Sequence, residues 1–546
     1  MRDGQKMALI GGIAAVVVGA TGFGVYALVG GDDGDGGSVA ADDGTSRKHV
    51  NTSPPSAHEV RTTAKTFLAA WSKGDSAGAA RQTDDSAQAA KDLRGFRSGA
   101  HVAKVALTPG TAGGTRVPFS ANARIAYGSE RAPLAYRSAL TVVRDKKTGR
   151  AVVHWKPSVL HPKLKQGESI RTGKAGTPPI KAVDRHGKTL SKQQHPALAG
   201  ILDDLRKRYG DKTDGQPGVE TRIVDAKGKD TGTTLRTLSK GTPGTLKTTL
   251  DEKVQSTAEA AVKGKPKASV VSVKPSTGEM LAVANSPADG FNTALRGSLA
   301  PGSTMKIVTA EMLLDKGITS PGKQDPCPKY VTYGGFKFHN DQKMEIKHGT
   351  FAQSFAASCN NAFIKEAKRL NDGDLPKEAK EVFGLGANWN VGVGTFDGSV
   401  PQQSGAQMGA SLIGQGGVRM DPLNIASVAA TVQSGEFKQP VIVSPSLDDR
   451  RLAKATRHMK PSVASGLKSL MKTTAQSGTA AKPMSGLGGD IGAKTGSAEV
   501  DGQKKPNAWF TAYSGDTAAA AVVPASGHGN ENAGPVVRKV LDAAGG

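Results

Sequence analysis

The sequence predicts a multidomain α+β protein, and three observations support that prediction. The chain has 546 residues, enough for three or four domains of average size. Residues 57–165 place a helical pattern before several alternating patterns, which is typical of a small α+β domain. Residues 246–546 place two strand patterns, a helical middle and further strands in that order. This order predicts an antiparallel sheet built from both ends of a larger domain.

The composition excludes several other classes of protein. Lys and Arg number 72 against 48 Asp and Glu, which gives a formal net charge of +24, and there are 69 Gly. The glycines follow no G-X-Y period, which excludes a collagen, and a single long apolar stretch excludes a polytopic membrane protein. The only two cysteines, Cys327 and Cys359, are too few for a disulfide scaffold or a zinc cluster.

Residues 1–30 predict a cytoplasmic tip followed by a membrane anchor. No side chain from Met7 to Val29 is charged, and a helix of this length rises ~1.5 Å per residue, enough to span a ~30 Å hydrocarbon layer. A cleaved signal peptide is the alternative, but its apolar core usually covers only ~7–15 residues. Arg2 and Lys6 precede the segment and aspartates follow it, so we expect a single-pass protein of the cell membrane with its bulk outside.

An extracytoplasmic location changes how the charge and the cysteines are interpreted. Nucleic acid is not an expected partner there. The basic charge suits either an anionic membrane or cell-wall surface or a solvated surface without a specific partner. Cys327 and Cys359 are open to two interpretations, a disulfide bond or two buried thiols.

Residues 31–56 are rich in Gly, Asp, Ser and Pro and predict a flexible linker. A helix follows, because Ser56 and Glu59 have the spacing of a capping box. Five apolar residues then share one helical face, namely Val60, Ala64, Phe67, Leu68 and Trp71. Alternating patterns predict strands at 115–127, 134–144 and 150–156. His101 and His154 are isolated in sequence, so we interpret them as surface or packing residues.

Residues 166–245 predict a linker domain of short strands, in which Asp184–Gly187 forms a tight turn. In the last domain, Thr249 is expected to cap a helix, and the turn Pro275–Gly278 is expected to join two strands. Helical patterns begin near Ser303 and near Pro535. The expected strands are Ser269–Val273, Met280–Ala284, Ile491–Thr495, Ala508–Tyr513 and Ala518–Val523.

Ser303-Thr304-Met305-Lys306 is the first candidate for chemistry. On a helix, residues three apart share a face, so the Lys306 amine is expected to approach the Ser303 oxygen. A serine becomes nucleophilic when a base takes its proton, and a buried lysine with a lowered pKa can serve as that base. The helix N-terminus adds N–H groups where an oxyanion would form. Alone, this pattern is common by chance.

Two further motifs follow. Ser358-Cys359-Asn360 offers a hydroxyl that can relay a proton and an amide that can hold a substrate carbonyl, although a helix cap is the simpler interpretation. Lys494-Thr495-Gly496-Ser497 follows an apolar strand, whose edge can align an extended substrate. A P-loop is excluded there, because that motif needs Gly directly before Lys and Ala493 holds that position.

The three motifs together resemble the S-x-x-K, S-x-N and K-T-G signature of penicillin-binding proteins and serine β-lactamases. Residues 246–546 resemble the transpeptidase branch of that superfamily, and Asp184–Gly187 resembles the linker of class B penicillin-binding proteins. Residues 57–165 are similar to the nuclear-transport-factor-like module of methicillin-resistance-type transpeptidases. The resemblance implies a penicillin-binding transpeptidase fold, an antiparallel sheet with a helical subdomain. That fold would be preceded by a linker or dimerisation-type domain at 166–245.

The resemblance implies a D,D-transpeptidase that cross-links peptidoglycan stem peptides and is acylated by β-lactams. Ser303 would be the nucleophile, Lys306 its base, Ser358 the proton relay, and Asn360 an orienting residue. Lys494 and Thr495 would hold the substrate carboxylate beside Gly496, and the N–H groups of Ser303 and Ser497 would form the oxyanion hole. No cofactor or metal is implied, and cell-wall synthesis proteins are expected partners.

Three other functions remain open at the level of the sequence. A β-lactamase would need an activated water, and no E-x-x-L-N pattern follows Asn360. A D,D-carboxypeptidase shares the first step and differs only in using water as the acceptor. A non-catalytic penicillin-binding scaffold or sensor is disfavoured, because the chain before Met7 is too short for a signalling domain.

Overall fold

The structure is a computed structural model that describes residues 50–545. The described chain separates into two units, residues 50–54 with 144–150, and residues 55–143 with 151–545. The predicted membrane anchor lies outside the described residues, as does most of the predicted flexible linker at 31–56. Between residues 50 and 545, no helix has both the length and the apolar character needed to cross a bilayer.

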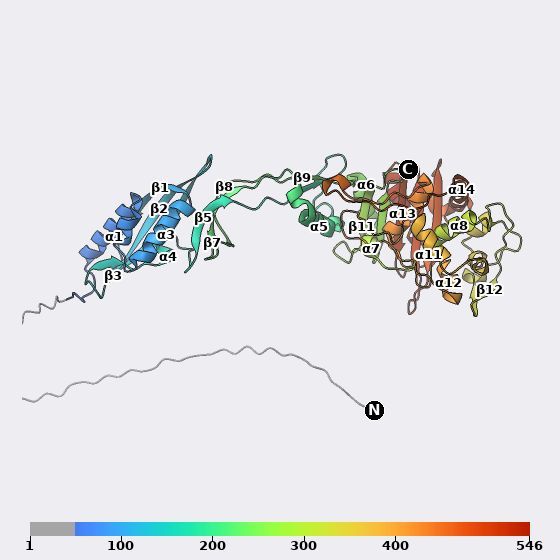
Figure 1. Cartoon of the computed structure of the whole chain (residues 1–546), viewed down its shortest axis with the longest axis horizontal. Coiled ribbons are helices and arrows are strands. Elements are labelled where there is room, and N and C mark those ends of the chain that lie inside the picture. The colour runs from blue at the N-terminus through green and yellow to red at the C-terminus, as the bar shows by residue number, and fades with distance from the viewer. Residues whose placement is uncertain (1–49, 546) are drawn as a thin grey trace, which may run out of the picture. The chain divides into compact units, whose positions relative to one another are not determined.

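The first domain packs helices α1 and α3 against a four-stranded sheet (Figure 1). Ser56 and Glu59 form the predicted capping box, and the five predicted apolar residues of the first helix are buried. Aromatic rings meet edge to face in this core, as Trp71 does with Phe96 and Phe119. The elements, with sheet order β1-β2-β3-β4, are α1 (Ala57–Ser72), α2 (Ser76–Ala80), α3 (Ser86–Gly99), β1 (Val102–Pro109), β2 (Arg116–Tyr127), β3 (Glu130–Arg144), β4 (Ala151–Val153) and α4 (Pro157–Leu160).

Residues 166–245, which the sequence predicts to be one linker domain, divide between two hydrophobic cores. Ile170 and Ile223 pack into the core of the first domain. They belong to a three-stranded sheet, β5 (Ser169–Lys174), β7 (Val219–Val224) and β8 (Asp230–Ser239). Leu202 and Leu205 instead pack into the core of the last domain. They lie on α5 (Ala199–Tyr209), near the parallel pair β6 (Lys181–Val183) and β9 (Thr245–Lys247).

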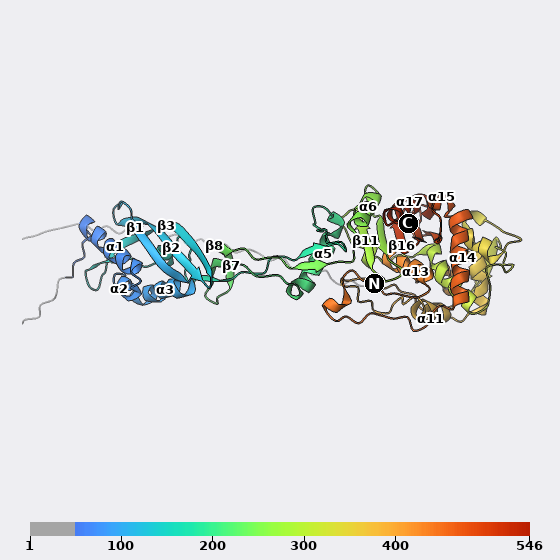
Figure 2. The same cartoon turned by 90° about the horizontal axis from the view of Figure 1, so that it is seen from above.

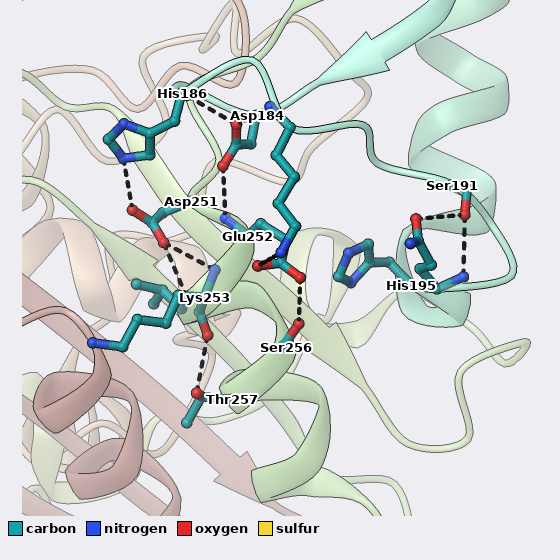
Figure 3. A network of polar contacts seen from close by, with 12 residues as sticks. Asp184, His186, Ser191, His195, Asp251, Glu252, Lys253, Ser256 and Thr257 are labelled. Carbon is teal, nitrogen blue, oxygen red and sulfur yellow. Dashed lines mark hydrogen bonds and ion pairs between the residues drawn. The ribbon is translucent and has the colours of Figure 1, made fainter.

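The predicted Asp184–Gly187 turn docks onto the start of helix α6 (Glu252–Val262) (Figure 3). Asp184 accepts hydrogen bonds from the N–H groups of His186 and Lys188 within its own turn, at 2.9 and 2.7 Å, and from Glu252 N at 3.2 Å. His186 Nε2 lies 3.2 Å from an Asp251 carboxylate oxygen. The polar groups of this turn therefore bond to the turn itself and to the start of α6. This agrees with interpreting it as a structural loop rather than a catalytic site.

The last domain is built on a five-stranded sheet of order β11-β10-β16-β15-β14. Its strands come from both ends of the domain, as the sequence predicts. Helices α6 and α17 cover one face of the sheet and α13 covers the other (Figure 2). The strands are β10 (Ser269–Val273), β11 (Met280–Asn285), β14 (Ile491–Ala498), β15 (Asn507–Ser514) and β16 (Thr517–Val523), and the latter two helices are α13 (Pro422–Ser434) and α17 (Gly534–Ala543).

The prediction that Thr249 caps a helix is wrong. The N-cap of α6 is Asp251, whose carboxylate accepts from the N–H groups of Lys253 and Val254. The Thr249 hydroxyl instead donates toward the carbonyls of Met280 and Val441, at 2.8 and 3.0 Å. A carboxylate two residues further along is the better cap, because it carries a full negative charge at the positive end of the helix.

The helical middle of the last domain carries the first two motifs. Cys327 and Cys359 form a disulfide bond, with their Cα atoms 6.0 Å apart, which decides between the two interpretations left open by the sequence. The elements of this part are α7 (Thr293–Arg296), η3 (Gly302–Met305), α8 (Lys306–Asp315), β12 (Tyr330–Tyr333), β13 (Phe336–His339), η4 (Asp341–Lys343), α9 (Phe351–Ala356), α10 (Asn361–Ile364), η5 (Lys365–Arg369), α11 (Asp374–Glu381), α12 (Gly405–Ser411) and α14 (Pro461–Ser477).

Candidate active site

Ser303 lies in the short 3-10 turn η3, directly before helix α8. Gly302 adopts a φ of +54°, and a Cβ built there would come within 2.5 Å of the Ser497 carbonyl oxygen. Glycine is therefore required for the Ser303 turn to pack against strand β14. Ser303 is partly exposed, and its hydroxyl forms no hydrogen bond within residues 50–545. The Ser303 hydroxyl and the Lys306 amine therefore do not form the predicted contact, because no hydrogen bond joins them.

The Lys306 amine is fully buried and turns toward the second motif. Its Nζ donates to the Ser358 carbonyl oxygen at 2.6 Å and to Asn360 Oδ1 at 2.7 Å, and it lies 3.5 Å from Ser358 Oγ. The ring centroid of Phe363 lies 5.6 Å from the same nitrogen. Three neutral oxygens and an aromatic ring therefore surround this amine on the described chain.

Lys494 approaches the same hydroxyl from strand β14. It is also fully buried, and its Nζ donates to Ser358 Oγ at 2.9 Å and to the Thr495 carbonyl at 3.0 Å. Ser358 lies two residues after the end of helix α9 and adopts a φ of +60°, and its hydroxyl contacts the amines of both Lys306 and Lys494. The three motifs, separated by some fifty and ~135 residues in the chain, therefore meet around one serine hydroxyl.

Burial sets the charge state of this centre. Within the described part of the chain, no carboxylate forms an ion pair with either amine, so burial opposes their charged forms without a compensating negative charge. Burial and the nearby charge of Lys494 lower the pKa of Lys306 well below its usual value of 10.5. Burial alone lowers the pKa of Lys494 to about 7. Burial therefore favours the neutral form of both amines, and a neutral amine can accept the proton of a serine hydroxyl.

Strand β14 forms an edge of the sheet and carries the remaining predicted residues. A Cβ at Gly496 would meet Trp509 Cβ at 2.9 Å and Thr304 Cγ2 at 3.0 Å, so a side chain there would push the strand away from the Ser303 turn. The Thr495 hydroxyl lies 2.6 Å from the Thr479 hydroxyl. Within residues 50–545, β14 pairs with β15 and with no other strand, so its other edge keeps backbone groups available for an extended substrate.

Two residues near the site were not predicted as members of it. Thr479 follows helix α14 and contacts Thr495, although no role is predicted for it from the sequence. His528 Nδ1 lies 3.5 Å from Ser497 Oγ and 3.8 Å from an Asp341 carboxylate oxygen. His528 is a single histidine in a loop, and no spacing in the sequence connects it with Ser497.

The antiparallel sheet, the helical subdomain and the two-lysine centre together define the penicillin-binding transpeptidase class of domain. The family model described as the penicillin binding protein transpeptidase domain matches residues 268–542, which is half of the chain. The chain belongs to this family. A second model, described as the NTF2-like N-terminal transpeptidase domain, matches residues 59–168, in agreement with the predicted nuclear-transport-factor-like module.

Curated relatives and solved structures agree with this assignment. The peptidoglycan D,D-transpeptidase PbpA of Mycobacterium tuberculosis is 27% identical over 370 residues, which cover 55% of this chain and 72% of that protein. PbpA of Mycolicibacterium smegmatis is 28% identical over 337 residues, which cover 50% and 64%. Penicillin binding protein 3 of M. tuberculosis shares the fold, with a TM-score of 0.53 and 19% identity over 68% of this chain and 96% of that one.

Proposed function

We propose that this protein is a peptidoglycan D,D-transpeptidase that acts through an acyl-enzyme on Ser303. The observation that carries the proposal is the convergence of two buried lysine amines, neither paired with a carboxylate of residues 50–545, on the Ser358 hydroxyl, in the same domain as the partly exposed Ser303. Membership of the transpeptidase family and the activity named for the PbpA relatives support the same reaction. The eight residues named from the sequence keep their roles as part of this proposal.

In the first half-reaction, Ser303 Oγ attacks the carbonyl carbon of the penultimate D-Ala while the neutral Lys306 amine accepts the hydroxyl proton. The N–H groups of Ser303 and Ser497 hold the oxyanion. Collapse of the tetrahedral intermediate breaks the peptide C–N bond. The proton passes from Lys306 through the Ser358 hydroxyl to the leaving D-Ala amine, which balances the step.

In the second half-reaction, an amine of a neighbouring stem peptide attacks the acyl carbonyl and loses its proton to the same relay. A new peptide bond forms and the Ser303 hydroxyl is restored. Lys494 and Thr495 would hold the terminal carboxylate of the donor, and Asn360 would orient its backbone beside the strand edge. Replacing the acceptor amine by water would give the carboxypeptidase reaction.

Labelling with a fluorescent penicillin tests the nucleophile. We expect the wild type to form a stable covalent adduct and Ser303→Ala to form none, because the acyl oxygen is removed. Ser465→Ala is the matched control, because Ser465 is an exposed serine on helix α14. This variant should label like the wild type. An adduct on Ser303→Ala would refute the assignment, and rapid loss of label from the wild type would indicate a β-lactamase. With a stem-peptide donor and an added amine, mainly hydrolysed product would indicate a carboxypeptidase.

We propose further that the chain is a single-pass protein of the cell membrane with its catalytic domain outside the cytoplasm. The uncharged run from Met7 to Val29 and the basic residues before it support this location. We expect the full chain to fractionate with membranes and to resist extraction by salt, while a chain starting at residue 31 is released. Release of the full chain by salt alone would contradict the proposal.

A further inference from the structure

The second motif contains a helix start whose own cap residue does not cap it. Asn360 occupies the N-cap position of α10, where an Asn side chain ordinarily accepts from the N–H groups of the first turn. Here the Asn360 side chain makes no such bond, and its Oδ1 instead accepts from Lys306 Nζ at 2.7 Å. The N–H groups at the start of α10 must therefore find acceptors elsewhere.

Those acceptors come from outside the motif. Asn340 Oδ1 accepts from the N–H groups of Asn360 and Asn361, both at 3.0 Å. The next N–H, that of Ala362, lies 3.1 Å from the sulfur of Cys359, which is part of the disulfide. Asn340 is only 1% exposed although it lies in a loop, so its amide is committed to these contacts rather than to solvent.

The other end of the Asn340 amide is also fixed. Its Nδ2 donates to the Met344 carbonyl at 2.7 Å and to the Pro328 carbonyl at 2.9 Å, and it lies 3.1 Å from Cys327 Sγ. A single buried amide therefore ties both partners of the disulfide to the start of α10. Leucine has a similar size but lacks every one of these polar atoms.

We infer that Asn340 is a positioning residue that caps α10 in place of Asn360, so that the Asn360 side chain is free to hold Lys306. The inference rests on the proposed function of the site. Without Asn340, one buried and one partly buried N–H group lose their acceptor, and the chain must shift to satisfy them. That shift moves the Ser358 carbonyl and the Asn360 amide away from Lys306, because both lie within two residues of the freed groups.

The test is a double-mutant cycle on the acylation rate of the full chain with fluorescent penicillin. We expect Asn340→Leu to slow acylation by about ten- to a hundredfold, the scale of misplacing a reacting group by roughly 1 Å. If Asn340 acts through Asn360, adding Asn340→Leu to Asn360→Ala costs at least about fivefold less than the product of the single effects. Multiplicative effects would overturn the inference.

A second readout separates positioning from general stability. Carbonyl oxygens that accept from Lys306 favour its charged form, so their loss should move the rising limb of the acylation–pH profile of Asn340→Leu to lower pH. Asn424→Ala is the matched control, because Asn424 is a buried helix-capping residue of α13 that also donates to the Phe396 carbonyl, outside the site. It should lower the melting temperature and leave the profile unchanged. An unchanged profile in Asn340→Leu would overturn the inference.

Two outcomes keep the inference and the proposed function distinguishable. If the wild type forms no adduct with penicillin, the proposed function fails, and the inference that rests on it fails with it. If the wild type labels and Asn340→Leu labels at the same rate, only the inference fails. Should Asn340→Leu not fold, Asn340→Asp keeps the acceptor for both N–H groups and loses the donors, so it should retain more activity than Asn340→Ser.

Discussion

Replacing Lys306 with methionine is expected to reduce the rate of acylation by penicillin by about 10³–10⁴-fold, near the upper end of what a general base contributes. Methionine matches the length of the lysine stem but cannot accept the Ser303 proton. The amine is fully buried and lacks a carboxylate partner within the described residues, so its loss removes no ion pair. The rate should be measured under single-turnover conditions, with penicillin in excess.

Lys316→Met provides the matched control, since Lys316 lies at the end of the same helix and pairs with Asp374 at the surface. It should acylate at the wild-type rate. Because burial penalises the charge of Lys306, the methionine variant should also melt no lower than the wild type, so that unfolding does not explain the loss. A rate within tenfold of the wild type would exclude Lys306 as the base.

The sheet of the last domain was predictable because its strands carry a strong local signal. Val270 and Val271 belong to a run that is buried on both faces, and such continuous apolar runs bounded by turn residues indicate central strands. Helix α1 was predictable for a similar reason, since its cap and its apolar face both lie within 16 residues. In these elements, local propensity and tertiary burial favour the same structure.

Elements with a weaker local pattern were missed. Strand β1 (Val102–Pro109) contains Lys104 and several small residues, and it is stabilised by pairing with β2 rather than by its own alternation. Helix α3 (Ser86–Gly99) buries only Ala89, Leu93 and Phe96, and it begins with a cap at Asp85. Three buried apolar residues in fourteen are too few to stand out in a polar stretch.

The site shows the same limit. The motifs located Ser303, Lys306, Ser358 and Lys494, and the structure brings the last three together. The detailed contacts followed from backbone geometry that no spacing encodes. The left-handed conformation of Ser358, unusual for a residue other than glycine, turns its hydroxyl toward both amines. Asn340 acts across a loop closed by the disulfide, and its neighbours in sequence carry no pattern that would indicate it.

Replacing Lys494 with methionine is expected to stabilise the protein at pH 6–7 while abolishing its activity. Burial lowers the pKa of Lys494 from 10.5 to about 7, which corresponds to a folding penalty of roughly 5 kcal/mol for the charged form. Losing the hydrogen bonds to Ser358 and Thr495 costs about 1 kcal/mol each. A net gain of about 1–3 kcal/mol in the free energy of unfolding should remain, measured by urea denaturation.

The way in which the free energy of unfolding changes with pH tests whether the buried charge of Lys494 is the cause of this gain. Between about pH 7 and 10.5 the unfolded chain holds a proton that folded Lys494 has lost, so the stability of the wild type rises with pH across this window. The penalty is complete below about pH 7, and the advantage of Lys494→Met should therefore shrink steadily from pH 7 to 9.5. Lys539→Met is the control, because Lys539 is an exposed residue of α17. The stability difference between this variant and the wild type should not change with pH in this way. Two results would contradict this prediction: Lys494→Met being less stable than the wild type at pH 6, or a stability gain that does not change with pH. Either result would mean that burying Lys494 does not destabilise the fold.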